Sequence, residues 1–299
     1  MKHALRAVRQ QSHIKEWTAA YLFLLPALVL FCLFVVYPMF RGVYLSFFQM
    51  QGRNTTWVGG ANYVQLWNDP VFWKSLVNTL LLVVGNVPIV VLFSLFVSYT
   101  IYRKPPAIRS FYRGVFYLPA VASTVSITVV WSWIYHPRYG ILNYILQLFG
   151  AQPVAWLGDP KWALLAVLAV MTTVSVGQPI VLYVASLGNI PESYIEAAEI
   201  DGANTWQRFR KIVWPLLMPT TLYIVIITTI NSFQVFAIIQ LLTSGGPAYS
   251  TTTFMYQIYE RAFQLGNFGQ SSALGVILAV IVIAISIIQY RLLDTDIEY

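Results

Sequence analysis

The chain has 299 residues, of which 58% are hydrophobic and only 10% are charged, whereas soluble domains usually carry about 25% charged residues. This composition excludes an ordinary soluble globular protein and favours a membrane protein. The formal net charge of +7 does not indicate a nucleic-acid partner, because the basic residues lie in small clusters between long apolar stretches. We therefore expect a membrane environment and no nucleic-acid binding.

The residue types that build most catalytic and metal sites are scarce. The single cysteine, Cys32, excludes an intramolecular disulfide, and we expect it to pack as a small hydrophobic residue. The histidines His3, His13 and His136 are too scattered for a zinc motif, and no glycine-rich run ends in the Gly-Lys-Ser/Thr of a P-loop. We expect no metal, no cofactor bound by this chain, no ATP site and no enzymatic activity.

Six stretches without charged residues are candidates for membrane helices, each of which needs about 20 apolar residues. The fifth stretch is broken by Gly245-Gly246-Pro247, so we place its helix at about 216–241, followed by a loop or re-entrant segment. The sequence thus predicts an all-α protein with a tail at 1–18 and a single six-span membrane domain at 19–299. The stretches lie between Glu16 and Arg41, Lys74 and Arg103, Arg113 and Arg138, Lys161 and Glu192, Lys211 and Glu260, and Arg261 and Arg291.

The basic residues also predict the topology. The basic flank of the first stretch resembles a secretion signal, but the stretch is too long and lacks a small-residue cleavage site, so we expect an uncleaved helix. With the N-terminus inside, the cytoplasmic side receives twice as many basic residues as the outer side, which favours two cytoplasmic termini. The inner set is Lys2, Arg6, Arg9, Lys15, Arg103, Lys104, Arg109, Arg113, Arg208, Arg210, Lys211 and Arg291, and the outer set is Arg41, Arg53, Lys74, Arg138, Lys161 and Arg261.

Five of the six spans contain an internal proline. Prolines are tolerated in membrane bundles because neighbouring groups can satisfy the backbone carbonyls that they leave free. Two interpretations remain open: ordinary kinks, or hinges of a bundle that opens first on one side and then on the other. The prolines are Pro26, Pro88, Pro119, Pro179 and Pro219.

The span centres contain uncharged polar residues but no Asp, Glu, Lys or Arg. Ion-coupled carriers usually need an ionisable group at depth, so this absence argues against a secondary carrier. The polar residues suggest either hydrogen bonds between helices or a neutral pocket for a hydroxyl-rich solute, with aromatic walls at Phe233 and Phe236. The polar set is Asn86, Thr172, Thr173, Ser175, Gln178, Asn231, Ser232 and Gln234, and the expected solute pathway comprises Gln178, Asn231, Gln234, Phe233, Thr173 and Gly177.

The segment 188–215 is the one long polar stretch between two apolar runs. We expect a short helix that starts at Asn189 or Ile190, with Pro191 in its first turn, and ends near Ile200. Asp201-Gly202 then ends this helix.

A second helix is expected after this break. Asn204 can cap it, with Gln207 completing a capping box, and Pro215 leads into the fifth span. We predict that this helix is amphipathic and lies on the membrane surface. Its apolar face is Trp206, Phe209, Ile212 and Val213, while Arg208, Arg210 and Lys211 would face lipid headgroups.

This segment resembles the EAA motif of ABC importer permeases. Three residues separate Glu196-Ala197-Ala198 from Gly202, and nine residues separate Gly202 from Ile212. One further residue then precedes Trp214-Pro215, where the family usually has Leu at the position of Trp214. In that family the loop docks into a cleft of a separate ATPase subunit, which binds ATP and Mg, and transmits the closure of that subunit to the membrane helices. The resemblance implies this coupling role for Glu196, Ala197, Ala198, Asp201, Gly202 and Ala203.

A second resemblance covers the region after the fifth span. Leu242-Thr243-Ser244-Gly245-Gly246-Pro247, Thr251-Thr252-Thr253 and Tyr259-Glu260-Arg261-Ala262-Phe263 resemble the carbohydrate-uptake subgroup related to maltose transport. This implies a bacterial inner- or plasma-membrane permease for a sugar or oligosaccharide. The implied partners are a second permease, two ATP-binding subunits and an extracytoplasmic solute-binding protein. A glycerol-phosphate-type or other polar solute, an ion-coupled carrier and a structural membrane scaffold remain as alternatives.

Overall fold

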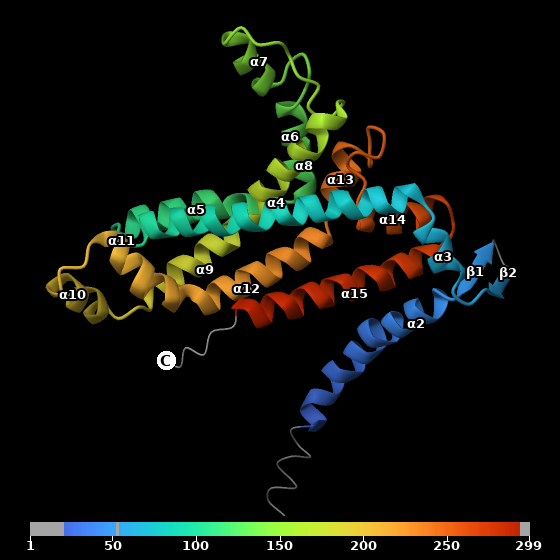
Figure 1. Ribbon diagram of the computed structural model, residues 1–299, viewed down its shortest axis with the longest axis horizontal. Helices are drawn as coiled ribbons and strands as arrows, with labels where there is room; N and C mark the ends of the chain where they lie inside the picture. The colour runs from blue at the N-terminus through green and yellow to red at the C-terminus, as the bar shows by residue number, and fades with distance from the viewer. Residues whose placement is uncertain (1–20, 52–53, 294–299) are drawn as a thin grey trace, which may run out of the picture.

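The computed structural model describes residues 21–51 and 54–293, and these residues are almost entirely helical (Figure 1). The predicted tail at 1–18, with its four basic residues, and Arg53 lie outside the described residues. Within these described residues, four helices are long and apolar enough to cross a membrane, and two bent helix pairs raise the number of spans to six if each pair is one span. The single helices are Tyr21–Leu45, α4 (Pro70–Ile101), Thr205–Phe233 and α15 (Phe268–Leu293); the pairs are α5 (Pro106–Val121) with α6 (Thr124–Ile134) and α8 (Pro160–Ser175) with α9 (Gly177–Gly188).

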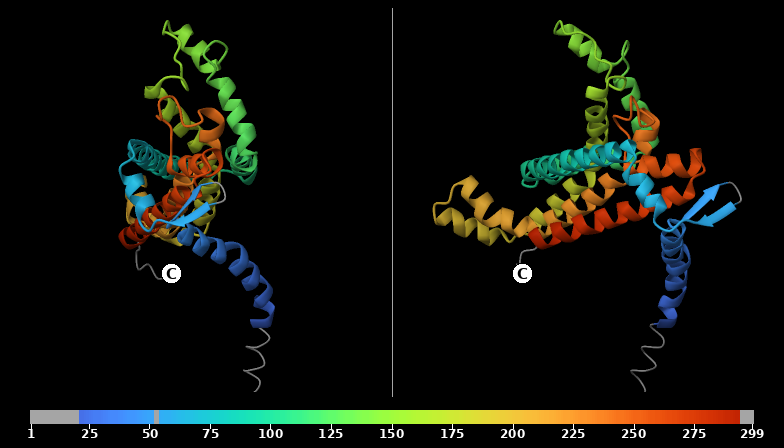
Figure 2. Two further views of the ribbon diagram at one scale, coloured as in Figure 1. Left: turned by 90° about the vertical axis from the view of Figure 1, so that its right-hand side faces the viewer. Right: turned by 45° about the vertical axis from the view of Figure 1, so that its right-hand side comes forward.

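The first helix, Tyr21–Leu45, stands apart from the other helices in every view (Figures 1 and 2). Its most apolar window is 0% buried, and only its last part, α2 (Tyr37–Leu45), packs against α15. Cys32 is exposed on this apolar helix, so any packing of it as a small hydrophobic residue is against groups outside the described part of this chain. So large an apolar surface requires lipid or another protein around it.

A β-hairpin follows the first helix, where the sequence analysis placed no strand. β1 (Phe48–Gln51) pairs antiparallel with β2 (Asn54–Trp57), and α3 (Ala61–Trp67) packs beneath. The buried amide of Asn62 donates to the carbonyl of Phe48 at 2.9 Å. A Cβ at Gly269 would lie 2.0 Å from that same carbonyl oxygen, so glycine allows α15 to approach the hairpin.

The helix ends near the hairpin are held together by a charged cluster. Asp69 caps α4 by accepting from the backbone N–H of Val71 at 2.8 Å, and its other carboxylate oxygen forms an ion pair with Arg261. Arg261, in η3 (Glu260–Gln264), also donates to Gln257 at 3.2 Å and to Gln270. The cluster therefore joins the start of α4 to α14 (Phe254–Tyr259) and to the start of α15.

One helix of each bent pair projects from the bundle, while the other helix, α5 or α9, packs within it. α5 and α6 meet at 97°, and α8 and α9 at 43°, so α6 and α8 rise away from α4, with α7 (Ile141–Leu148) at their far end (Figures 1 and 2). Pro88, Pro119 and Pro219 lie inside helices. Pro179 lies in the first turn of α9, where its missing N–H is tolerated, just after the 43° bend inside the predicted fourth span.

The fifth span differs from its predicted range of 216–241. Its helix runs from Thr205 through α11 (Thr205–Arg208) and η2 (Phe209–Val213) to the end of α12 (Trp214–Phe233), and 234–236 separate it from α13 (Ala237–Leu242). The break lies where the loop before α14 enters the bundle. There the hydroxyl of Thr253 contacts the carbonyl of Val235 at 3.4 Å, and Asn78 donates to the carbonyl of Thr252 at 3.0 Å.

Candidate functional site

A short helix and a tight turn form the end of the molecule opposite the hairpin (left in Figure 1). α10 (Glu192–Ile200) starts three residues later than the earliest predicted start, because Asn189 still belongs to the end of α9. Ile195 is buried in a cluster with Leu187 and Val213, which anchors the helix to the bundle. The rest of α10 is largely exposed.

The turn after α10 follows the predicted local chemistry. Gly202 has φ +76°, the left-handed region that favours glycine, and an added Cβ would meet nothing within 4 Å. Asn204 then forms the predicted capping box: its side chain accepts from the N–H of Gln207 at 2.9 Å, and Gln207 accepts from the N–H of Asn204 at 2.8 Å. The glycine break and the Asn204 cap are both confirmed.

The separate surface helix predicted after this turn is wrong. α11, η2 and α12 form one continuous helix of 29 residues. The reason lies just before Pro215, where the N–H of Trp214 bonds to the carbonyl of Phe209, five residues back, in a π-turn. This wider turn accommodates the missing N–H of Pro215 without ending the helix.

Most of the predicted apolar face packs on protein, although Trp206 is largely exposed. Phe209 meets Tyr99 of α4 edge-on, with ring centroids 5.2 Å apart, and Trp206 stacks on Phe209 at 5.7 Å. Arg208 does not face headgroups but forms an ion pair with Glu199 of α10. α10, the glycine turn and the start of the long helix are therefore joined to one another and to the end of α4.

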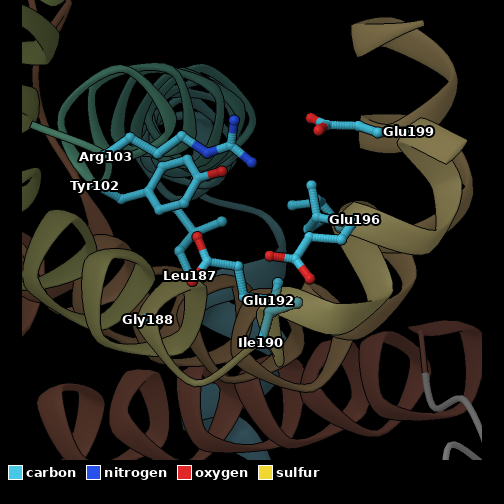
Figure 3. A pocket seen from close by; sticks show the side chains of 10 residues that line it. Tyr102, Arg103, Leu187, Gly188, Ile190, Glu192, Glu196 and Glu199 are labelled. Carbon is cyan, nitrogen blue, oxygen red and sulfur yellow. The ribbon is translucent and has the colours of Figure 1, made fainter. Parts of the chain in front are cut away.

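A cavity of about 530 Å³ lies between α10 and the ends of α4 and α9 (Figure 3). Glu192, Glu196 and Glu199 line it from α10, and Tyr102 and Arg103 enter from the opposite side. Burial raises the pKa of the Tyr102 hydroxyl above its ordinary value of 10.0, although neighbouring Arg103 acts against this shift, so the hydroxyl stays neutral at physiological pH. The cavity thus offers carboxylates on one wall and a cation on the other.

Two further cavities flank the turn, with volumes of about 410 and 480 Å³. Ala198 and Asp201 line both, and Gly202 lines the smaller. Ile200, the last residue of α10, is 87% exposed. All six predicted coupling residues line one of the three cavities: Glu196, Ala197, Ala198, Asp201, Gly202 and Ala203. A hollowed surface with an exposed apolar side chain is suited to receive a protein partner.

Removal of the cap tests whether it holds this turn. Replacing Asn204 by alanine is expected to destabilise the start of the long helix by about 1 kcal/mol. Hydrogen exchange of the amides at 204–208 should become faster by several-fold, while amides in the middle of α12 keep their protection. Asn204→Asp is the control, because aspartate can still accept from the N–H of Gln207. Equal exchange in all three proteins would contradict the capping role.

The predicted pathway residues separate into two groups. Gln178, Asn231 and Gln234 are exposed. Phe233 is 0% exposed, within a core cluster, and a Cβ at Gly177 would lie 2.8 Å from a carbonyl oxygen of α5. These two residues are therefore packing positions, next in sequence to the exposed Gln234 and Gln178.

Thr173, near the end of α8, is partly buried. It lines a largely apolar cavity of about 240 Å³ between α4, α5 and α8. Its hydroxyl donates to the carbonyl of Ala169 at 2.9 Å, within its own helix. Across residues 21–51 and 54–293, no group of three or more His, Cys, Asp or Glu is placed to hold a metal ion.

Sequence reasoning missed several residues of this region. Arg103 was counted only for topology, Tyr102 was not singled out, and the exposure of Ile200 was not foreseen. The sequence did contain one usable signal: Glu192, Glu196 and Glu199 follow one another at helical spacings of four and three, which places them on one face of α10. The opposing Arg103 lies almost ninety positions earlier and could not be paired with them from spacing.

Comparisons with known proteins cover nearly the whole chain. The model of the family described as "Binding-protein-dependent transport system inner membrane component" matches residues 21–299. The "Probable ABC transporter permease protein YurN" of Bacillus subtilis (strain 168) is 37% identical over 93% of this chain and 97% of its own length. The "Lactose transport system permease protein LacF" of Rhizobium radiobacter is 32% identical over 95% and 97%.

A solved structure shares the arrangement of helices. It is a chain of a bacterial ABC transporter involved in the import of the acidic polysaccharide alginate, and it superposes with a TM-score of 0.82. The two chains are 26% identical, and the match covers 95% of this chain and 98% of the other. The bent pairs and the long continuous helix therefore belong to a fold with an experimentally determined example.

Proposed function

The chain belongs to the family of binding-protein-dependent transport system inner membrane components, and we propose that its cargo is a sugar or an oligosaccharide. Membership makes it a membrane-spanning permease subunit of an ABC importer, not an enzyme. The observation that carries the cargo proposal is the exposed trio of amides, Gln178, Asn231 and Gln234, because uncharged amides pair with sugar hydroxyl groups. The similar lactose permease and alginate importer chain support the same class.

Transport needs partners that supply energy and complete the pathway. We assign ATP and Mg binding to two separate ATPase subunits, solute capture to an extracytoplasmic binding protein, and the other half of the pathway to a second permease. The amides are exposed on the single chain, as expected for residues that face the second permease across a shared pathway. Phe233 and Gly177, each next to one of these amides in the sequence, are tightly packed in the chain.

The region of α10 and Gly202 is the proposed contact with an ATPase subunit. Its support is physical: three cavities, an exposed Ile200 and an open left-handed turn meet at one end of the molecule. The charge distribution of the sequence places this end in the cytoplasm, where ATP is available.

An uptake assay tests the cargo proposal. The importer, purified with its partner subunits and binding protein, is reconstituted in vesicles and offered lactose, maltose, alginate oligosaccharides and glycerol 3-phosphate. We expect ATP-dependent uptake of one of the saccharides. Replacing both Asn231 and Gln234 by leucine should lower the maximal uptake rate about tenfold, since about 1.4 kcal/mol of lost hydrogen bonding changes a rate by that factor.

The matched control is Gln147→Leu, which changes an exposed amide on α7, away from the three amides. It should transport at the rate of the unchanged protein. Uptake of glycerol 3-phosphate alone would show that the cargo is a phosphorylated polyol and not a sugar. Unchanged saccharide uptake in the double variant would remove Asn231 and Gln234 from the pathway.

A further inference from the structure

Asn86 lies in the middle of α4 and is only 1% exposed, although its side chain is polar. Its amide nitrogen donates to the hydroxyl of Ser232 in α12 at 3.0 Å. Its amide oxygen accepts from the hydroxyl of Thr172 in α8 at 2.9 Å. One side chain therefore connects three separate membrane helices.

The surroundings of Asn86 are apolar and tightly packed. Its neighbours Leu82 and Val83 belong to two different core clusters, on the α8 side and the α15 side. Next to it, a Cβ at Gly85 would lie 2.8 Å from a methyl group of Leu168, so α8 approaches α4 closely at this level. An amide buried in such surroundings is unfavourable unless it is hydrogen-bonded, so its partners must stay in place.

Both partners lie directly before an interruption of their own helix. Thr172 is in the last turn of α8, before the 43° bend into α9, and Ser232 is next to the last residue of α12. The exposed amides continue from these points: Gln178 follows the bend, and Asn231 and Gln234 flank the end of α12.

We propose that Asn86 is a positioning residue of the solute pathway. It fixes the end of α8 relative to the end of α12 and thereby sets the spacing between Gln178 on one side and Asn231 and Gln234 on the other. Asn86 itself is buried and does not touch solute. This inference rests on the proposed function of the three amides, but the spacing that it predicts is measurable without any solute.

The test measures that spacing in the assembled importer. Cysteines replace Gln178 and Asn231 in a Cys32→Ser background, are spin-labelled, and give a distance distribution by electron–electron resonance in lipid nanodiscs. Asn86→Leu should at least double the width of the distribution. Asn143→Leu is the matched control: Asn143 is a buried asparagine with four hydrogen bonds within the α7 loop, and its loss should leave the width unchanged.

Single-arm variants keep the test valid if Asn86→Leu fails to assemble. Ser232→Ala removes only the arm to α12, and Thr172→Val removes only the arm to α8. Each single change should broaden the distribution by less than Asn86→Leu does. In the double variant Ser232→Ala with Thr172→Val, the further change Asn86→Leu should not broaden the distribution any more. A width unchanged in the single-arm variants would overturn the proposal.

Transport provides the second readout, with saccharide uptake measured per ATP hydrolysed. We expect Asn86→Leu, in the chain without spin labels, to lower this ratio at least threefold. The variant leaves the region of α10 and Gly202 unchanged, so ATP is still hydrolysed, but it disturbs the spacing of the pathway residues. A broadened distribution with an unchanged ratio would overturn the positioning role and leave the sugar importer standing. Absence of saccharide uptake by the unchanged protein would instead overturn the proposed function, while the distance result still decides whether Asn86 sets the spacing.

Discussion

Replacing Gly202 by valine is expected to lower solute uptake by one to two orders of magnitude while the importer still assembles. Gly202 holds φ +76°, where a β-branched residue is strongly disfavoured, by about 1–2 kcal/mol or more. The turn also borders a cavity of about 410 Å³, so a side chain there enters the space proposed for the ATPase subunit. Solute-stimulated ATP hydrolysis should fall together with uptake, because the contact between the subunits is changed.

Two other substitutions at Gly202 distinguish two causes of this loss, the strained backbone conformation and the added side chain. Asparagine tolerates the left-handed region better than valine does, and alanine adds the smallest side chain. If backbone conformation is decisive, Gly202→Asn should be more active than Gly202→Ala. If free space is decisive, the order should reverse. Full solute-stimulated ATP hydrolysis in Gly202→Val would contradict a coupling role for the turn.

Replacing Arg261 by methionine is expected to destabilise the protein by about 3 kcal/mol, the usual loss when one partner of a largely buried ion pair is removed. Arg261 is 12% exposed and Asp69 25%, and the same guanidinium also reaches Gln257 and Gln270. Removal of Arg261 leaves the carboxylate of Asp69 without its cation at the start of α4. The measurement is the thermal unfolding midpoint of the purified complex.

A double-mutant cycle identifies the cause of this loss. Asp69→Asn removes the charge but keeps an oxygen that can cap α4, so it isolates the ion pair from the cap. Asp69→Asn combined with Arg261→Met should destabilise by clearly less than the sum of the two single changes. Arg210→Met, at an exposed arginine, should leave the midpoint within a degree or so of the unchanged protein. An Arg261→Met midpoint equal to that of Arg210→Met would refute the buried pair.

The helices were predictable where a local rule decides the outcome. Charge-free runs located the apolar helices but not all of their bounds, and the residue types at Gly202 and Asn204 were enough to predict a break and a capped helix. The end of the fifth span was not predictable, because Gln234-Val235-Phe236 contains no glycine or proline. That helix ends where Thr253, eighteen residues later, reaches the carbonyl of Val235.

Tertiary packing also decided the role of the polar residues in the spans. Asn86, Gln178 and Asn231 look alike in sequence, as single amides in apolar runs. In the structure Asn86 is buried between three helices, whereas the other two are exposed. Composition indicated a choice between hydrogen bonding and solute contact, and only the arrangement of helices shows that Asn86 is used for hydrogen bonding between helices. The same limit applies to Pro215, whose effect on its helix depends on the π-turn before it.

The unbroken passage from α11 through η2 into α12 has a mechanical consequence. A straight helix of 29 residues is about 44 Å long, and it joins the glycine turn directly to Asn231. Although Pro219 lies inside it, no break separates its turns, and if the helix rotates as a rigid body, a rotation of about 5° at the turn displaces the far end by about 4 Å, roughly the size of a sugar hydroxyl group with its hydrogen bond. The fifth span can thus act as a lever arm, which converts a small movement of a partner subunit into a change in pathway width.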